Sequence, residues 1–316
     1  MRLFQKLKKV DGWRAISFLE NNVCAAHVRR MPNVKPKVTL ALSVAVNGLS
    51  NNTFLEKLAK DWHGDRYQCT TLLSGGEYRF LPVDAPQVPV AELKPAISWV
   101  IKDMLDFHID EATVDVLSIP AEKNAPQRNR AMYAVAARSK VIEERQHRFE
   151  DAKIPLRVID IPEMAQRNIA ALYEPEGRGL AVLSLGAQGG LLTITAGGEL
   201  YFARRIDITL EQLLQSGPEK REAYHDRIAL EIQRSLDHFG RQYQSITLSK
   251  LMLAPMGDDD GGLQAYLAEN LDKPVESMNL ESVLDFSDVH DLKRPDKQQY
   301  YFLTLGAALR LEEKVL

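Results

Sequence analysis

The sequence predicts an α/β protein built of two lobes. Stretches in which apolar and polar residues alternate interchange with stretches of helical periodicity along the 316 residues. Each half of the chain begins with three strand-like stretches and continues into helices and further strands, a weak duplication of architecture rather than of letters. The length also exceeds what one hydrophobic core usually supports, about 250–300 residues, so two lobes are expected.

Three predicted strands open the first half. Residues 13–20 and 23–30 flank Asn21-Asn22, which favours a hairpin turn because asparagine tolerates positive φ. Residues 38–46 alternate in the same way and predict the third strand.

A helix and a proline-rich connector come next. Thr53 and Glu56 have capping-box spacing and predict the start of the helix. Residues 82–90 predict irregular structure and a change of subdomain, because each proline fixes φ and removes a hydrogen-bond donor. Apolar residues then recur at i, i+4, i+7, i+8 and i+11 and predict an amphipathic helix: Leu93, Ile97, Val100, Ile101 and Met104.

The remainder of the first half alternates again between strands and helices. Strands are predicted at 113–119 and 131–137, and a helix at 139–152. A strand at 156–161 leads into a further helix, with Pro162 at a first position where proline is tolerated.

The second half opens on three strands, at 180–185, 191–195 and 200–208. Glycine-rich turns, Gly186–Gly190 and Ala196–Gly198, join them.

A long helix, 219–239, follows, with Gly240 as its expected C-terminal stop. The last predicted elements are a strand at 246–253, a helix at 263–271 and a closing helix at 300–311, in which Gly306-Ala307-Ala308 allow close packing.

Composition narrows the classes of function. The net charge of −3 argues against a nucleic-acid partner, because nucleic-acid-binding domains are usually strongly basic. The two cysteines, Cys24 and Cys69, stand alone, so neither a disulfide framework nor a zinc ribbon is predicted, and a reduced intracellular setting fits. No metal site is expected.

Segments that could meet a membrane were also considered. The longest apolar run, 38–49, is too short to span a bilayer, and the start of the chain lacks the apolar core of a signal peptide. Residues 1–9 mix Leu3, Phe4 and Leu7 with basic residues, which favours either a weak peripheral membrane contact or a frayed tail.

Six segments stand out by their order and spacing: 84–89, Met132–Arg138, Ile159–Glu163, Gly198–Asp207, Glu231–Leu236 and Leu305–Arg310. Together they resemble the actin-like ATPase superfold, and more narrowly the PilM family of type IV pilus assembly proteins, above all its MSHA-pilus branch. The cytoplasmic domain of the secretion protein GspL is a nearby relative in the same fold.

The resemblance implies an actin-like, two-lobed (RNase H-like) fold with an inserted small α/β subdomain. The first lobe would comprise residues 10–81 and 154–178, the insert 82–153, and the second lobe 179–316.

It also implies a cleft that holds ATP between two hairpins and a glycine turn. Phosphate loops need glycine backbone, a cation and an acid for Mg²⁺. The first hairpin, residues 15–24, has neither glycine nor lysine. In the second hairpin Ser184 replaces the acid, although Gly186, Gln188 and Gly189 remain.

The adenosine turn is altered as well. Ala254-Pro255 stands in place of the glycine pair, whereas Gly257, Gly261 and Gly262 remain. Asp258-Asp259-Asp260 predicts a solvated acidic turn rather than a metal site. The vestigial cleft candidates are therefore Ser184, Gly186, Gln188, Gly189, Gly257, Gly261 and Gly262, with no catalytic residue and no cofactor expected.

We therefore expect a non-catalytic scaffold in the cytoplasm, peripheral to the inner membrane. The resemblance implies that it binds the N-terminal peptide of a single-span inner-membrane pilus assembly protein, in a groove at the insert, and contacts the pilus extension ATPase. Two alternatives stay open: an actin-like ATPase that uses ATP with Mg²⁺ at a divergent site, and a GspL-like adaptor of type II secretion.

Overall fold

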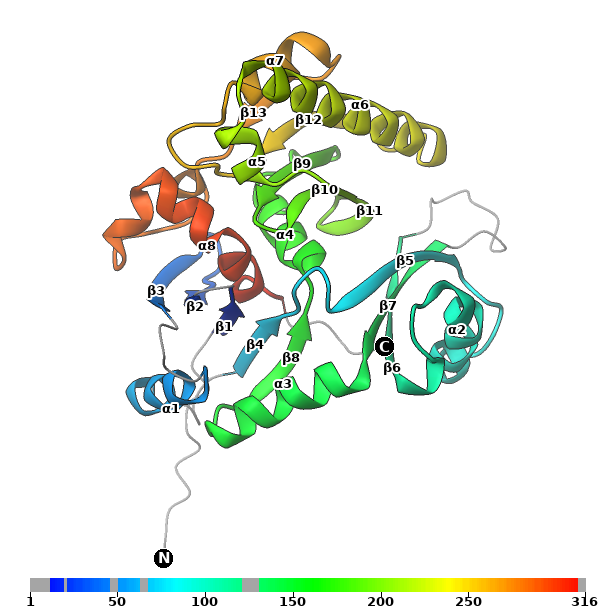
Figure 1. Ribbon diagram of the computed structural model, residues 1–316, viewed down its shortest axis with the longest axis vertical. Helices are drawn as coiled ribbons and strands as arrows, with labels where there is room; N and C mark the ends of the chain where they lie inside the picture. Colours follow the sequence, from blue (N-terminus) through cyan, green and yellow to red (C-terminus); the bar gives the residue numbers. More distant parts are fainter. Residues whose placement is uncertain (1–11, 20–21, 46–50, 63–67, 121–130, 312–316) are drawn as a thin grey trace, which may run out of the picture.

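The computed structural model describes residues 12–19, 22–45, 51–62, 68–120 and 131–311 (Figure 1). The basic segment 1–9 and most of the loop before residue 131 lie outside these ranges, as does part of the predicted Asn21-Asn22 turn.

Two five-stranded sheets with the same strand order form the framework. The first has the order β3-β2-β1-β4-β8, made of Lys37–Ala45, Asn22–Arg29, Trp13–Phe18, Gln68–Leu72 and Leu156–Asp160. The second has the order β11-β10-β9-β12-β13, made of Glu199–Ile206, Gly189–Ala196, Gly179–Gly186, Leu248–Leu253 and Val275–Ser277. In both sheets three antiparallel strands are followed by two that run parallel to the first strand. The architectural duplication read from the sequence is confirmed, and the chain has the actin-like, two-lobed fold.

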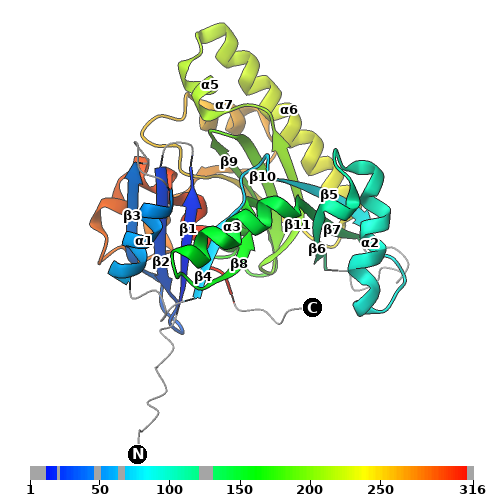
Figure 2. The ribbon, with the colours of Figure 1, turned by 60° about the horizontal axis from the view of Figure 1, so that its bottom comes forward.

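Helices cover both faces of the first sheet. On one face α1 (Asn51–Trp62) and α3 (Ser139–Asp151) pack against alternate strand residues such as Ile16 (Figure 2). On the other face α8 (Pro295–Ala308) packs against residues such as Ala15. Neighbouring strand residues thus face opposite sides of the sheet, as the alternating apolar pattern of the sequence predicts.

Helix α4 (Pro162–Ala170) lies against α8 between the two sheets (Figure 1). The two backbones approach so closely that a Cβ on Gly306 would lie 2.2 Å from the carbonyl oxygen of Ala165. The small residues predicted to allow close packing therefore do so. The second sheet is covered by α5 (Leu210–Gln215), α6 (Pro218–Gln242) and α7 (Leu263–Asn270).

The insert is a three-stranded antiparallel sheet, β5-β7-β6, of residues Tyr78–Asp84, Ala131–Arg138 and Ala112–Ser118. Helix α2 (Leu93–Ile101) buries Ile97 and Ile101 against it. The insert also contacts the second lobe, because the Tyr133 hydroxyl donates to the carbonyl oxygen of Tyr201 at 3.1 Å.

Some sequence expectations are wrong. Pro82 belongs to β5, paired with Tyr133, because an edge strand tolerates a residue without a donor. Thr53 lies inside α1, and α6 runs past Gly240 to Gln242. On α2, Val100 is 48% exposed and outside the core.

Another helix bound also differs from the predicted one: α8 begins at Pro295 rather than at residue 300. Strands β4 and β13 and helix α5 were not predicted.

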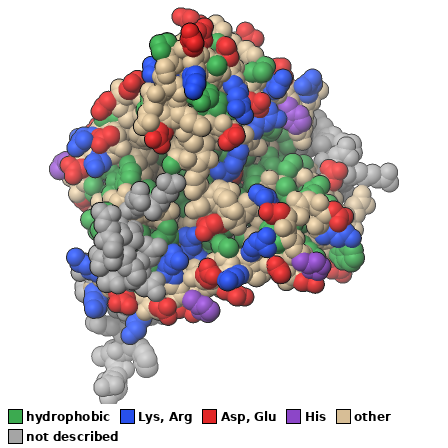
Figure 3. All heavy atoms as spheres, viewed as in Figure 1, with side chains coloured by type: hydrophobic (Ala, Val, Ile, Leu, Met, Phe, Trp, Pro, Cys, Tyr) green, Lys and Arg blue, Asp and Glu red, His purple; other side chains and the backbone are tan. Residues whose placement is uncertain are grey.

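Within the part of the chain that the structure describes, no helix combines the length and the apolar character needed to cross a bilayer. Basic and acidic side chains are interspersed over the face drawn in Figure 3.

Candidate functional site

A cavity of about 460 Å³ opens between the two lobes. Its walls come from the end of β1 (Ser17–Leu19), the segment after β4 (Leu72–Ser74), the β9–β10 hairpin, Ala254-Pro255 after β12, and α8. The ends of β1 and β2 and the β9–β10 hairpin therefore border one cavity.

Four of the seven candidate residues line this cavity: Ser184, Gly186, Gln188 and Gly189. The backbone requires glycine at one of the two glycine positions but not at the other. Gly189 has φ +100°, and a Cβ there would lie 2.8 Å from the carbonyl oxygen of Ile206, so the turn itself requires it. A Cβ on Gly186 would meet no atom within 4 Å, so the space beside it is open cavity.

Ser184 is engaged inside its own lobe. Its hydroxyl donates to Gln166 Oε1 at 2.6 Å, and Gln166 Nε2 donates to Thr193 Oγ1 at 2.9 Å and to two backbone carbonyls. Gln166 is fully buried. The serine that replaces the expected acid thus helps to fix α4 on the second sheet.

Gln188 crosses the cleft. Its Oε1 accepts the backbone N–H of Gly75 at 2.7 Å, which joins the second-lobe hairpin to the turn between β4 and β5. The side chain lies at the predicted hairpin, but its role in the structure is to connect the two lobes.

A buried polar cluster lies beside this connection. Arg205 Nη2 donates to Glu163 Oε1 at 2.9 Å and to the Tyr78 hydroxyl, and that hydroxyl donates to Glu163 Oε2. Glu163 is only 1% exposed. Burial and the charge of Glu163 hold the pKa of Tyr78 well above its usual range, so the phenol stays protonated. Burial opposes the charge on Arg205, but Tyr78 and Glu163 outweigh it and raise the pKa of Arg205.

The cluster determines the charge available in the cavity. Among the described residues that line it, Arg205 is the only basic one and Asp296 the only acidic one. Arg205 is paired with Glu163, and Asp296 with Arg294 at 2.9 Å. The cavity therefore offers phosphates no uncompensated cation.

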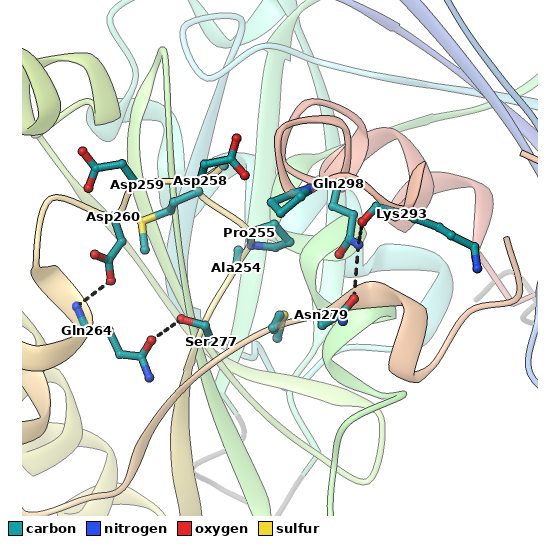
Figure 4. Close-up of a pocket in the computed structure, with 14 residues that line it drawn as sticks. Ala254, Pro255, Asp258, Asp259, Asp260, Gln264, Ser277, Asn279, Lys293 and Gln298 are labelled. Atoms are coloured by element: carbon teal, nitrogen blue, oxygen red, sulfur yellow. Dashed lines mark hydrogen bonds between the residues drawn. The ribbon is translucent and has the colours of Figure 1, made fainter. Parts of the chain in front are cut away.

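Gly257 borders a separate cavity of about 440 Å³ in the second lobe, beyond the ends of β12 and β13 (Figure 4). Asp260 points toward α7, where its carboxylate accepts the N–H groups of Gly262 and Gln264 at 2.9 and 3.0 Å. Asp259 accepts the N–H of Gly261 at 2.7 Å. These carboxylates thus serve to shape the turn and cap α7.

Gly261 and Gly262 line neither cavity. Both have positive φ, +63° and +79°, at the start of α7. Because glycine adopts positive φ more easily than other residues, the turn accounts for glycine at both positions. Across the described residues, no group of three or more His, Cys, Asp or Glu side chains could hold a metal ion.

A third cavity, of about 250 Å³, lies between the insert and the first lobe. It is lined by Thr113 and Asp115 of β6, by Val135 and Ala137 of β7, by Ile142 and Gln146 of α3, and by β8 residues 156–159. β8 is the last strand of its sheet, so one of its edges is unpaired among the described strands. We call this cavity the insert groove.

Sequence reasoning missed Leu72–Ser74, Arg205 and α8 as cleft residues. Glu163 and Arg205 lie in two segments that carry the family resemblance, Ile159–Glu163 and Gly198–Asp207, but no motif in either segment marks a cleft residue. The one local signal was the turn-forming Ser74-Gly75-Gly76.

Comparison with known proteins gives two findings. The family model described as "Type IV pilus assembly protein PilM" matches residues 87–216. The structure of a PilM-PilN type IV pilus biogenesis complex superimposes with a TM-score of 0.70 at 19% identity, over 95% of this chain and 98% of that chain. The chain thus has a PilM-like region and the same overall fold.

Two further structures are more distant. The cytoplasmic domain of EpsL, an inner-membrane component of the type II secretion system of Vibrio cholerae, gives a TM-score of 0.44 at 12% identity, over 66% of this chain and 76% of that chain. A Bacteroides thetaiotaomicron protein with an actin-like ATPase fold gives 0.49 at 12% identity, over 93% and 98%. No curated protein matches the sequence.

Proposed function

We propose that this protein is a non-catalytic, actin-like scaffold of type IV pilus assembly that binds the cytosolic N-terminal segment of a single-span inner-membrane protein. One observation carries the proposal. The match to the pilus assembly family, residues 87–216, contains every lining residue of the insert groove except Leu73.

The insert groove suits an extended peptide. Val135, Ala137 and Ile142 supply apolar wall, and β8 offers a strand edge for main-chain hydrogen bonds. Strand addition to an exposed edge, with side chains in flanking pockets, is a recurrent mode of peptide recognition. Two charged residues lie at the wall: Asp115, which is paired with Lys94 at 2.8 Å, and the exposed Arg157. We expect the apolar wall to carry most of the affinity, with Arg157 available to an acidic group of the peptide.

The absence of catalysis is part of the proposal. Phosphoryl transfer needs cations and an acid positioned around the phosphates. Here the second hairpin has Ser184 in place of the acid, and Arg205, the one basic residue among the described lining of the cleft, is paired with buried Glu163. We expect no cofactor.

The finer assignment is to the MSHA-pilus branch, at the cytoplasmic face of the inner membrane and in contact with the extension ATPase. It rests on the segments quoted above, such as Gly198–Asp207 and Leu305–Arg310. Co-purification from cells that make MSHA pili, with the membrane partner as bait, tests it; recovery with type II secretion components instead would contradict it.

The peptide site is tested by fluorescence anisotropy with a labelled N-terminal peptide of the PilN-like protein from the same organism. Ile142→Glu should weaken binding at least tenfold, because it places a charge in the groove. Leu230→Glu on α6 is the matched control, since Leu230 is an exposed leucine far from the groove in sequence and should leave affinity unchanged. Equal binding by both variants would place the peptide elsewhere.

A further inference from the structure

The interlobe cavity has the size of a small-molecule site but not the chemistry of a nucleotide site. Its volume of about 460 Å³ falls within the range of ligand pockets, which is roughly 300–1,000 Å³. Its wall is mainly apolar and includes Phe18, Leu185, Phe302 and Leu303. Such sites combine apolar wall with a few polar groups that orient the ligand.

The charges at the cavity compensate one another. Arg205 is bound to Glu163, and Asp296 is bound to Arg294. A polyphosphate would have to lose hydration beside apolar wall and a buried carboxylate, with no free cation in return. An uncharged molecule would meet no such barrier.

The lining also supplies polar groups without net charge. Asn22, Ser74 and Gln299 line the cavity, and none belongs to the Arg205 cluster. Leu19, another lining residue, is 42% exposed, an apolar side chain for which the described chain provides little cover.

We propose that the interlobe cavity binds an uncharged, largely apolar small molecule in place of a nucleotide. The site adjoins the insert groove, with which it shares Leu73, but all its other lining residues differ and it does not depend on the pilus peptide. Its occupant is a small molecule rather than a protein surface because the space is a bounded volume between two lobes.

Gly186 makes the proposal testable. A Cβ there meets no atom within 4 Å, and the φ of Gly186 lies outside the left-handed region, so Gly186→Leu should place a side chain in the cavity without straining the backbone. Gly76 is the matched control: a Cβ there also meets nothing within 4 Å, but the residue is exposed and does not line the cavity.

The probe is Nile red, an uncharged apolar dye, titrated into the full chain. We expect saturable one-to-one binding with a blue-shifted emission, a loss of affinity of at least tenfold in Gly186→Leu, and no change in Gly76→Leu. Should Gly186→Leu misfold, Leu303→Glu provides a second variant, because it places a charge in the neutral cavity and should lower the affinity similarly.

Three results would overturn the proposal: no saturable binding, binding that Gly186→Leu and Leu303→Glu leave unchanged, or displacement of the dye by millimolar ATP with Mg²⁺. Displacement would identify a nucleotide site. Peptide binding to the insert groove, measured on the same variants, should persist and separates this proposal from the proposed function.

Discussion

Arg205 on β11 donates to Glu163 at the start of α4 at 2.9 Å, across 42 positions of sequence, and this ion pair ties the second-lobe sheet to the segment that leaves the first lobe. Glu163 is buried and Arg205 is about one-third exposed, so the carboxylate depends on the guanidinium for its charge. Together with the Gln188–Gly75 hydrogen bond, the pair holds the cleft in one geometry.

Removing the cation should therefore destabilise the chain. Arg205→Ala should lower the free energy of unfolding by about 2–3 kcal/mol, somewhat less than the cost of breaking a fully buried pair because Arg205 is partly solvated. Arg204→Ala is the control: its partner Glu231 lies 3.1 Å away and both side chains are about 30% exposed, so the loss should stay below about 1 kcal/mol. Urea unfolding measures both; equal losses would show that the Glu163 pair contributes no more than a surface pair.

Two glycines inside helices predict opposite effects of the same substitution. Gly306→Ala should destabilise by about 3 kcal/mol or more, since the new Cβ would sit 2.2 Å from the carbonyl oxygen of Ala165 and force α4 and α8 apart. Gly240→Ala should stabilise by about 0.5–1 kcal/mol, because its Cβ meets nothing and alanine is the better helix former. Thermal unfolding of the two variants measures both effects. A Gly306→Ala variant as stable as the unmodified chain would contradict the close crossing of α4 and α8.

Strands with an apolar alternation or a continuous apolar run, such as β9, were predicted, whereas β4, which has neither, was missed. β4 has the sequence Gln-Cys-Thr-Thr-Leu and is buried on both faces, with Thr71 donating to the carbonyl oxygen of Ile16, so no apolar period marks it. The end of β5 was assigned to the proline-rich connector 82–90. Pro82 is acceptable in a strand only because β5 lies at an edge of its sheet, which the local sequence does not show.

The candidate site divides in the same way. Ser184, Gly186, Gln188 and Gly189 were candidates because the resemblance assigns a phosphate loop to the second hairpin, and the structure places them at the cavity. The pairing of charges in the cleft could not be predicted from the sequence. Tyr78, Glu163 and Arg205 come together only because the insert and the second lobe pack on α4.

Buried His27 should make the chain acid-sensitive. Burial, with the charges of Arg14 and Arg29, lowers the pKa of His27 to about 4, below the usual 6.5. Because the unfolded chain then takes up the proton first, stability is lost as pH falls from about 6.5 to about 4, by up to about 3 kcal/mol. His27→Gln should flatten this part of the stability curve from urea unfolding at pH 7, 6 and 5. If the stability of the variant falls with pH as steeply as that of the unmodified chain, groups other than His27 cause the pH dependence.

Both cysteines should be inert in the folded chain. Cys24 and Cys69 are buried, and burial raises the pKa of Cys24 to about 11 and that of Cys69 further still, so neither forms thiolate near neutral pH. Titration with a disulfide reagent should find no reactive thiol in the native chain and two after unfolding in urea. Rapid modification under native conditions would contradict the burial.

Magnesium-ATP should neither bind nor turn over. The first hairpin has no glycine or lysine, the second has lost its acid to Ser184, and Arg205 is committed to Glu163. Calorimetric titration to millimolar nucleotide should give no heat of binding, and a phosphate-release assay should not rise above the buffer rate. Glu163→Gln sharpens the experiment, because it frees the charge of Arg205 while keeping the side-chain shape. If weak ATP binding appears in that variant alone, the ion pair is what closes the cleft to phosphates; turnover by the unmodified chain would instead mean that other residues have replaced the missing lysine and acid.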